Sequence, residues 1–141
     1  MAQMLIGGEW VGSRSGNSIE VLNPATGEPV DTAPRATAED AREAIDAAHS
    51  AFAMWSEWTQ AKRAEVLYRA VELIHLHEKE LATLLTKEQG KPLREAMLEI
   101  RRYAHTIKYY AGLGKNIRGG YIPQIDENRY GLIIKRPLGV V

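Results

Sequence analysis

Two kinds of hydrophobic pattern divide this sequence. From about residue 37 to 115, apolar side chains recur at every third or fourth position, which is the spacing of amphipathic helices. Residues 4–35 and 119–137 instead hold short apolar runs separated by Gly, Pro and Asn, which is typical of strands joined by turns. We therefore predict a mixed α/β segment of about four helices, with short strands before them and a hairpin after them.

Capping and breaking residues separate the four predicted helices. The first begins after Thr37 and the second after Thr59, because each hydroxyl can accept a bond from a free helix amide. Gly90 ends the third helix, since glycine tolerates the left-handed conformation that closes a helix. Pro92 lies in the first turn of the fourth, which frays at 112–114. The stripes predicted to pack inward are Ala41, Ala44, Ile45, Ala48, Phe52 and Trp55 on the first helix, and Ala96, Ile100, Tyr103, Ala104, Ile107 and Ala111 on the fourth.

The predicted strands come in pairs. A turn at Gly7-Gly8 joins the first pair, and the Pro and Gly residues of 23–28 mark the turn of the second. A polar segment at 126–128 separates two apolar runs near the end of the chain and indicates a hairpin with a longer loop. The strands are expected at about 5–6, 9–11, 19–22, 29–33, 121–123 and 130–134.

The amino-acid composition argues against several classes of function. The chain has 141 residues and equal numbers of basic and acidic side chains, 18 of each, which argues against a nucleic-acid or anionic-membrane partner. No apolar run approaches the ~20 residues of a membrane span, and the first residues do not form a secretory signal. The absence of cysteine excludes disulfides, thiolate metal sites and a cysteine nucleophile within these residues. We expect a cytoplasmic protein.

Two groups of residues could indicate a metal site or a coenzyme-binding loop, but neither pattern supports such a site. His75 and His77 are two positions apart, so on a helix they point to different faces and cannot share a metal ion. The run 112–114 lacks a third glycine and a preceding strand, so it is not a dinucleotide-binding loop. Nothing in the chain is predicted to run a reaction alone.

Two motifs are more specific than this background. Residues 23–28 read Asn-Pro-Ala-Thr-Gly-Glu, and residues 88–92 read Glu-Gln-Gly-Lys-Pro, which couples a helix stop directly to a helix start. Together with four further motifs, in the order in which they occur along the chain, they resemble the aldehyde dehydrogenase family. Within that family the resemblance is strongest to the group that includes succinate-semialdehyde dehydrogenases. The four further motifs lie at 7–11, 51–55, 109–112 and 137–141.

The resemblance implies NAD(P)-dependent oxidation of an aldehyde to a carboxylic acid through a cysteine thioester, with a semialdehyde as a candidate substrate. In the family the nucleophile, the base and the coenzyme site follow later in the chain, so these residues are expected to be inactive alone. The resemblance divides the chain into 1–118, which packs on the coenzyme domain, 119–137, an oligomerisation hairpin, and 138–141, the start of the first strand of a Rossmann-type coenzyme domain. The chain thus looks like the leading part of a larger enzyme.

The resemblance also assigns two sets of residues. Main-chain oxygens of Val21 and Leu22, with the Glu88 carboxylate, match a family site for sodium or potassium; these oxygens suit a hard cation. Many relatives have aspartate where this chain has Glu88, and an ordinary helix-end role for Glu88 is an equal alternative. Leu98 and Arg102 match positions that line the substrate entrance, where Arg102 could attract an acidic aldehyde. The alternative is that Arg101 and Arg102 form a solvated pair.

Three interpretations of function remain open. The first is the leading part of an enzyme that acts on a small aldehyde with NAD or NADP and assembles as a homo-oligomer through the hairpin. The second is a non-catalytic binding or assembly module that docks on a full-length relative. The third, an unrelated helical scaffold, does not explain the ordered motifs. The identity of the aldehyde and the choice of coenzyme are not predicted by these residues.

Overall fold

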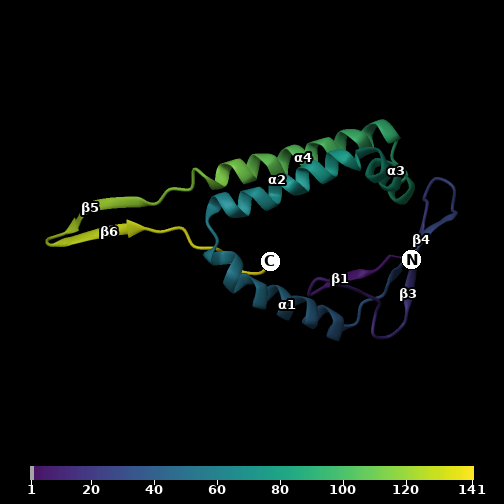
Figure 1. Cartoon of the computed structure of the whole chain (residues 1–141), viewed down its shortest axis with the longest axis horizontal. Helices are drawn as coiled ribbons and strands as arrows, with labels where there is room; N and C mark the ends of the chain where they lie inside the picture. Colours follow the sequence, from purple (N-terminus) through teal and green to yellow (C-terminus); the bar gives the residue numbers. More distant parts are fainter. Residues whose placement is uncertain (1) are drawn as a thin grey trace.

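A computed structural model of the chain describes residues 2–141 and confirms the mixed α/β architecture, with four helices and three antiparallel strand pairs (Figure 1). β1 pairs with β2, β3 with β4, and β5 with β6, and the described residues form no larger sheet. The elements are β1 (Met4–Ile6), β2 (Glu9–Val11), β3 (Ser18–Leu22), β4 (Pro29–Pro34), α1 (Ala38–Glu57), α2 (Gln60–Leu76), α3 (Glu78–Gln89), α4 (Leu93–Gly114), β5 (Gly120–Asp126) and β6 (Arg129–Ile133).

The buried centre of the molecule is a seam of small side chains. α2 and α4 lie side by side, and α3 packs on both near one end (Figure 1). Every apolar side chain that is buried lies on one of these three helices, and none of the largest side chains is fully buried within residues 2–141. Methyl groups let helix backbones approach closely, so we call the buried set the alanine seam. Its members are Ala64, Val71, Ala82, Ala96, Ala104 and Ala111.

The stripe predicted for α1 is largely uncovered. Ile45 is 57% exposed, and Ala41 and Ala48 are also exposed, so the prediction that they pack inward is wrong for this structure. α1 lies apart from α2 and α4 and packs chiefly on β1 (Figure 1), and that narrow strand pair covers only part of the helix. The same correction applies to Tyr103, which is 59% exposed because it lies beside Ala104, at the margin of the buried face.

The predicted helix boundaries are confirmed with two small corrections. Thr37 caps α1 and Thr59 caps α2, each accepting a hydrogen bond from a main-chain amide, and Gly90 ends α3 with a φ of 72°. Pro92 is the residue before α4 rather than part of its first turn. α4 does not fray at 112–114, because its glycines lie close to α2, where side chains at these positions would contact Tyr68 and Gln60.

Asp40 fastens the loop before β3 to the start of α1. Its buried carboxylate accepts hydrogen bonds from the main-chain amide of Thr37 at 2.8 Å and from the Thr37 hydroxyl at 3.0 Å. Ser13 and the main chain of Arg14 also donate to it, at 3.3 and 3.4 Å. The Thr37 amide, followed by the Thr37 hydroxyl and the Arg14 and Ser13 donors, holds the pKa of Asp40 below its ordinary value against the opposing effect of desolvation.

We expect Asp40→Asn to lower stability at neutral pH and to flatten its decline in acid. Because the folded pKa is depressed, the carboxylate contributes fully above about pH 4, the unfolded value, and this contribution is lost as pH falls through the lower folded pKa. Urea unfolding at pH 7 and across the acid range measures both effects. Asp46→Asn, an exposed change on the same helix, is the control. Equal effects of the two substitutions would contradict this role.

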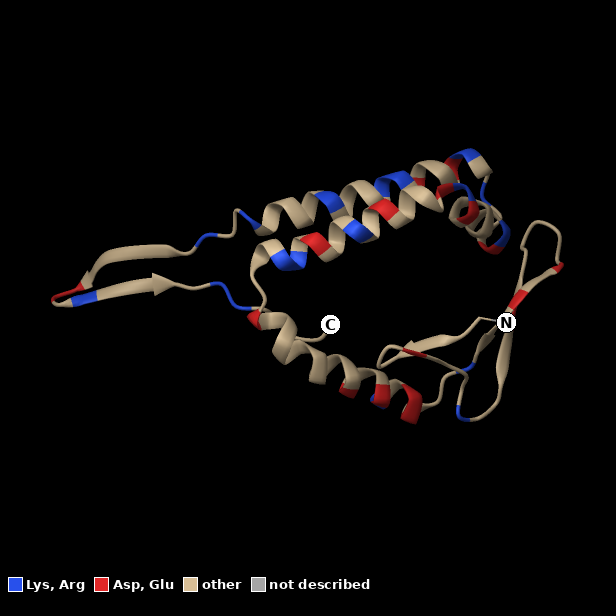
Figure 2. Cartoon of the chain, in the orientation of Figure 1, with Lys and Arg blue, Asp and Glu red and all other residues tan. Residues whose placement is uncertain are grey.

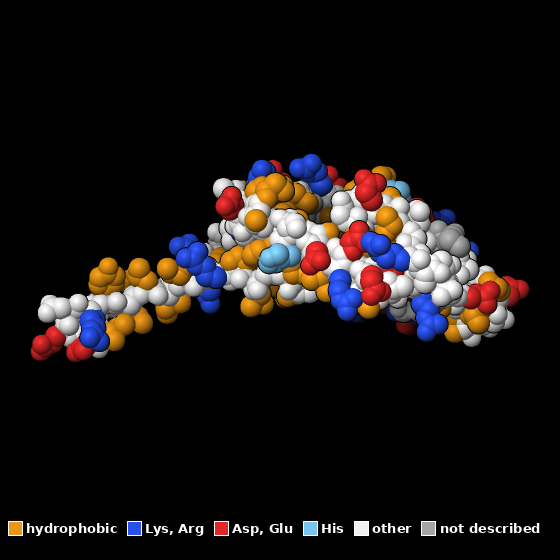
Figure 3. Space-filling model, turned by 90° about the horizontal axis from the view of Figure 1, so that it is seen from below, with side chains coloured by type: hydrophobic (Ala, Val, Ile, Leu, Met, Phe, Trp, Pro, Cys, Tyr) orange, Lys and Arg blue, Asp and Glu red, His pale blue; other side chains and the backbone are white. Residues whose placement is uncertain are grey.

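The β5–β6 hairpin projects from the helices as a two-stranded ribbon with two different apolar faces (Figures 1 and 3). The first, the tyrosine face, carries Tyr121 against Tyr130, with ring centres 5.9 Å apart, and Leu132 opposite Tyr121. The second, the isoleucine face, carries Ile122, Ile125 and Ile133, which lie over Gly131 and Gly120. All six of these side chains are exposed by 43% or more.

The turn of this hairpin is tighter than predicted. β5 continues to Asp126 and β6 starts at Arg129, so two residues form the turn instead of a longer loop. Asn128 adopts a φ of 60°, a left-handed conformation that asparagine tolerates well. The register shifts between Ile122 and Asp126, and this irregularity absorbs the residues that the sequence pattern placed in the loop.

No helix in residues 2–141 has both the length and the apolar character needed to cross a membrane.

Candidate functional site

The two specific motifs, far apart in the sequence, meet in the structure. The Asn23 side chain accepts a hydrogen bond from the amide of Ala25 at 2.9 Å, and its main-chain carbonyl accepts one from Gly27 at 2.7 Å, so 23–28 forms a tight turn. This turn presents Pro24 to Gly90: a Cβ atom built on Gly90 would lie 2.9 Å from Cγ of Pro24. The strand turn and the α3–α4 junction are therefore in direct contact.

The residues expected to bind a monovalent cation lie on both sides of this contact. Val21 and Leu22 end β3, and the β3–β4 register shifts between them, which is where a ladder leaves main-chain groups free for other partners. Glu88 is exposed in the last turn of α3, which packs against β3, and its side chain has no hydrogen bond or ion pair within residues 2–141. The buried hydroxyl of Thr86, on the same turn, also has no hydrogen-bond partner among these residues.

This donor set consists of oxygen atoms, which fit a hard cation. Carbonyl, hydroxyl and carboxylate oxygens are the ligands that such cations prefer. Residues 2–141 contain no group of three or more His, Asp or Glu side chains that could hold a metal ion, so a transition-metal centre is not formed here. The structure juxtaposes the elements that carry Val21, Leu22 and Glu88 and leaves the Glu88 carboxylate available.

A salt bridge that the sequence analysis missed fixes the junction beside Glu88. Lys91, in the link between α3 and α4, pairs with Glu99 on α4, and the Lys91 side chain is only 25% exposed. The two residues are eight positions apart, which is not a neighbour spacing on a helix, so the pattern of charges gave no signal for the pair. The bridge ties the residue after Gly90 to the second turn of α4.

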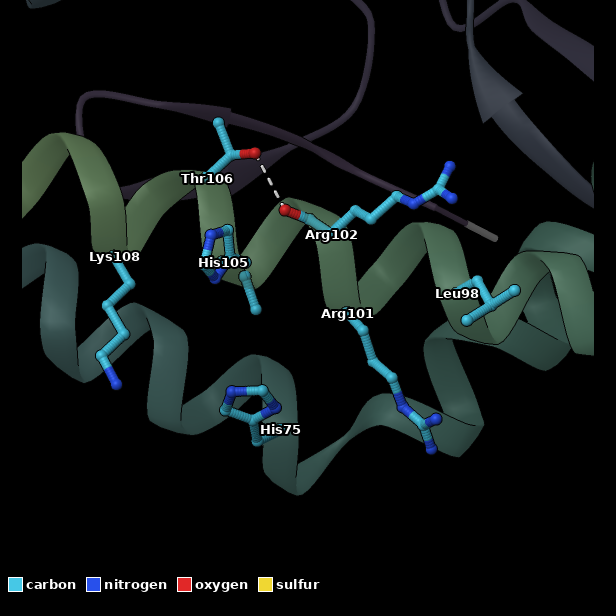
Figure 4. Close-up of a pocket in the computed structure, with 8 residues that line it drawn as sticks. His75, Leu98, Arg101, Arg102, His105, Thr106 and Lys108 are labelled. Atoms are coloured by element: carbon cyan, nitrogen blue, oxygen red, sulfur yellow. Dashed lines mark hydrogen bonds between the residues drawn. The ribbon is translucent and has the colours of Figure 1, made fainter.

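The second candidate site lies on α4, where Leu98 and Arg102 line an open cavity of about 670 Å³ (Figure 4). Leu98, Arg102 and Thr106 are spaced four residues apart and so share one face of the helix. In Figure 4, Arg102 and Thr106 extend to one side of α4, whereas Arg101 and Lys108 extend to the other, toward His75 on α2. Leu98 is 44% exposed, and the Arg102 side chain is exposed without a partner in residues 2–141.

Both members of the arginine pair are exposed, as the alternative predicts, and the Arg101 side chain is 56% exposed, but only Arg101 has an acidic partner in residues 2–141. Arg101 donates to Glu78 of α3 from both Nε and Nη2 at 2.8 Å, and the Glu78 side chain is only 18% exposed. Arg101 therefore joins α3 to α4 and is committed to structure. Arg102, one residue later, points away from this bridge and remains free to meet a ligand. The adjacent positions have different roles because successive residues on a helix are turned by about 100°.

His75 and His77, near the α2–α3 boundary, pair with different acidic residues. His77 pairs with Glu80 at 2.9 Å, and Nδ1 of His75 lies 4.0 Å from Glu78. Each histidine therefore has its own acidic neighbour at helical spacing, which is a common surface arrangement.

Comparison with known proteins agrees with the motif geometry. The model of the aldehyde dehydrogenase family matches residues 10–141, which include both of the motifs that meet at Pro24 and Gly90. The chain belongs to the aldehyde dehydrogenase family. As a family member it is 43% identical over 139 residues to the mitochondrial succinate-semialdehyde dehydrogenase of Oryza sativa subsp. japonica, a match that covers 99% of this chain and 26% of that protein.

Two further members of the aldehyde dehydrogenase family support the same assignment. The succinate-semialdehyde dehydrogenase of Escherichia coli (strain K12) whose name specifies NADP(+) is 41% identical over 98% of this chain and 29% of its own length. The crystal structure of succinate-semialdehyde dehydrogenase from Burkholderia pseudomallei superposes with a TM-score of 0.94 at 40% identity, covering 99% of this chain and 29% of that one. The chain thus spans between a quarter and a third of the length of these relatives.

Proposed function

We propose that this chain forms the N-terminal portion of an NAD(P)-dependent aldehyde dehydrogenase that oxidises a semialdehyde to a carboxylic acid through a cysteine thioester. The observation that carries the proposal is the contact between the 23–28 turn and the α3–α4 junction at Gly90, which unites the two most specific motifs. The names of the relatives support the substrate class, and one of them names NADP(+). The chemistry requires a thiolate nucleophile, and these 141 residues contain no cysteine.

The proposal assigns a task to each part of the chain. Residues 1–118 pack on the coenzyme-binding domain, 119–137 form an oligomerisation hairpin between copies of the protein, and 138–141 begin the first strand of the coenzyme domain. The many exposed large apolar side chains support this division, since an isolated soluble domain rarely leaves so much apolar surface in water. In the proposal the protein is a cytoplasmic homo-oligomer.

The test is an assay of the complete gene product with succinate semialdehyde and either NAD+ or NADP+, followed by the absorbance of the reduced coenzyme. We expect turnover by the complete product and none by residues 1–141 alone, which have no thiol to attack the aldehyde. Absence of turnover with every aldehyde tried would favour the second interpretation. That interpretation is a non-catalytic assembly module, and the exposed faces of the hairpin are the observation that supports it.

In this proposal Arg102 attracts the acidic end of the substrate, and Leu98 forms an apolar part of the same entrance. We expect Arg102→Ala to lower the ratio of kcat/KM for succinate semialdehyde to kcat/KM for a neutral aldehyde of similar length by about tenfold, the loss of one charge-assisted contact. Arg101→Ala is the matched control, because it removes the same charge from the neighbouring position that pairs with Glu78. A ratio that falls equally in both variants, or in neither, would rule out this role.

We also propose that Val21, Leu22 and Glu88 bind sodium or potassium. We expect Glu88→Gln to abolish the rise in melting temperature that potassium produces relative to choline at the same ionic strength, because the neutral amide does not supply the anionic ligand. Glu72→Gln, an exposed change on α2, should leave that rise unchanged. The assignment fails if the wild-type protein melts at the same temperature in both salts.

A further inference from the structure

A cavity at the root of the hairpin has no part in the sites described so far. It has a volume of about 440 Å³ and lies where four segments distant in sequence converge: the end of α1, the first turn of α2, the α4–β5 link and the segment after β6. Such a volume is in the range of small-ligand sites. The residues that line it are Trp55, Ser56, Gln60, Arg63, Ile117, Lys135, Arg136 and Pro137.

On one wall of this root cavity, hydrogen bonds to main-chain carbonyls hold the guanidinium of Arg63 in place. Nη1 of Arg63 donates to the main-chain carbonyls of Trp55 at 3.2 Å and Ser56 at 3.4 Å, and more closely to that of Trp58. These carbonyls belong to the end of α1, so Arg63 offsets the negative pole of that helix. Only Nη1 has a hydrogen-bond partner within residues 2–141, and the other two nitrogens of the guanidinium remain available to a ligand.

The opposite wall supplies two more cations. Lys135 and Arg136 follow β6, both are exposed, and neither forms an ion pair within residues 2–141. Figure 2 places basic residues on both segments that join the hairpin to the helices, and Figure 3 shows basic side chains at the root of the ribbon. The acidic residue of this junction is Glu57, the last residue of α1, which neither lines the cavity nor pairs with a cation in the described residues.

Three positive charges therefore line a concave site to which no carboxylate of residues 2–141 contributes, in a chain whose formal net charge is zero. The start of α2 adds to the positive potential, because Gln60 and Arg63 lie in the first turn of that helix, where amides point outward. The Ser56 hydroxyl already donates to the main-chain carbonyl of Ala53 at 2.9 Å, so the Gln60 side-chain amide is the neutral donor that this surface offers to an anion. An anion with several oxygens and more than one negative charge meets all of these groups at once.

We infer that the root cavity binds a small phosphate-bearing anion, held by Arg63, Lys135 and Arg136. Two guanidinium groups and one ammonium match a tetrahedral dianion better than a single carboxylate, since each oxygen can receive its own charge-assisted bond. The bound anion would join the segment after β6 to α1 and α2, and so fix the direction in which the hairpin leaves the helices. The inference does not depend on the proposed dehydrogenase activity.

The test uses the complete gene product and inorganic phosphate as the probe, with isothermal titration at constant ionic strength set by sodium chloride. We expect saturable binding by the wild-type protein and at least about tenfold weaker binding by the double variant Lys135→Gln, Arg136→Gln, the loss of two charge-assisted contacts. The matched control is Lys115→Gln, Arg118→Gln, which removes the same charge from the same root outside the cavity lining. This control should bind phosphate within about twofold of wild type, because long-range effects are screened by salt.

Two results would overturn the inference. One is equal weakening in both double variants, which would show a diffuse positive potential without a site. The other is the absence of saturable phosphate binding by the wild-type protein, as expected if an acidic side chain of another polypeptide segment fills the cavity. A second measurement keeps the test independent of how the variants fold: phosphate should raise the melting temperature of the wild-type protein more than chloride does at the same ionic strength.

Discussion

Ala104→Leu is expected to destabilise the protein by about 3 kcal/mol, more than any other single change considered, because it inserts a branched side chain into a fully packed helix contact. Ala104 has no exposed surface and lies in the alanine seam, on the face of α4 that packs against α2. Ala104 also borders the open cavity beside His75, but we expect its helix contact to leave too little room for three further carbons and α2 and α4 to move apart. That movement would also loosen the contacts of Ala96 and Ala111 on the same face.

Urea unfolding followed by circular dichroism measures this change. Ala53→Leu, on an exposed part of α1, introduces the same side chain where solvent can accommodate it and should alter stability by less than about 0.5 kcal/mol. If Ala104→Leu were as mild as Ala53→Leu, α2 and α4 would not be in close contact through their alanines. The comparison thus tests the packing itself, independently of any activity.

Gly90→Ala is expected to cost about 2 kcal/mol, the second-largest effect, because two separate penalties act at one position. Gly90 has a φ of 72°, which an L-amino acid side chain disfavours, and an added Cβ atom would approach Cγ of Pro24 to 2.9 Å. The substitution should therefore separate the 23–28 turn from the α3–α4 junction. Because Val21 and Leu22 precede that turn and Glu88 precedes Gly90, the proposed response to potassium should weaken as well.

Gly16→Ala separates the two penalties. Gly16 has a similar φ of 68°, but nothing lies within 4 Å of the added Cβ atom, so the change carries only the backbone cost of about 1 kcal/mol. Thermal unfolding of the two variants in potassium and in choline gives both comparisons. Equal losses of stability, with an unchanged potassium response in Gly90→Ala, would mean that the contact with Pro24 contributes nothing.

Local features of the chain were predictable from the sequence, because they depend on residues within one turn of each other. Thr37, Thr59 and Gly90 act as helix caps through their own hydroxyl groups or their own backbone freedom, and each prediction is confirmed. The failure at Ile45 has a different origin. Periodicity shows that a helix has an apolar face, but it does not show which element covers that face, and residues 2–141 provide too little cover for α1.

The candidate site shows the same division. The motif order indicated the family, yet the contact of Pro24 with Gly90 joins positions 66 residues apart and follows only from the fold. The bridge from Arg101 to Glu78 likewise decides which of two adjacent arginines is free, and nothing in the sequence pattern distinguishes them. The basic root cavity was missed because Arg63 and Lys135 are far apart in the chain. The adjacent Lys135 and Arg136 gave the only local signal.

The unlike faces of the hairpin constrain the stoichiometry of any assembly that it builds. A two-fold contact buries the same face of both copies, so one such contact can hide the tyrosine face or the isoleucine face and leaves the other in water. Hiding both faces by two-fold contacts requires two different contacts for each ribbon, and hence more than two chains. A dimer that is soluble and stable must cover the second face with another part of its own surface.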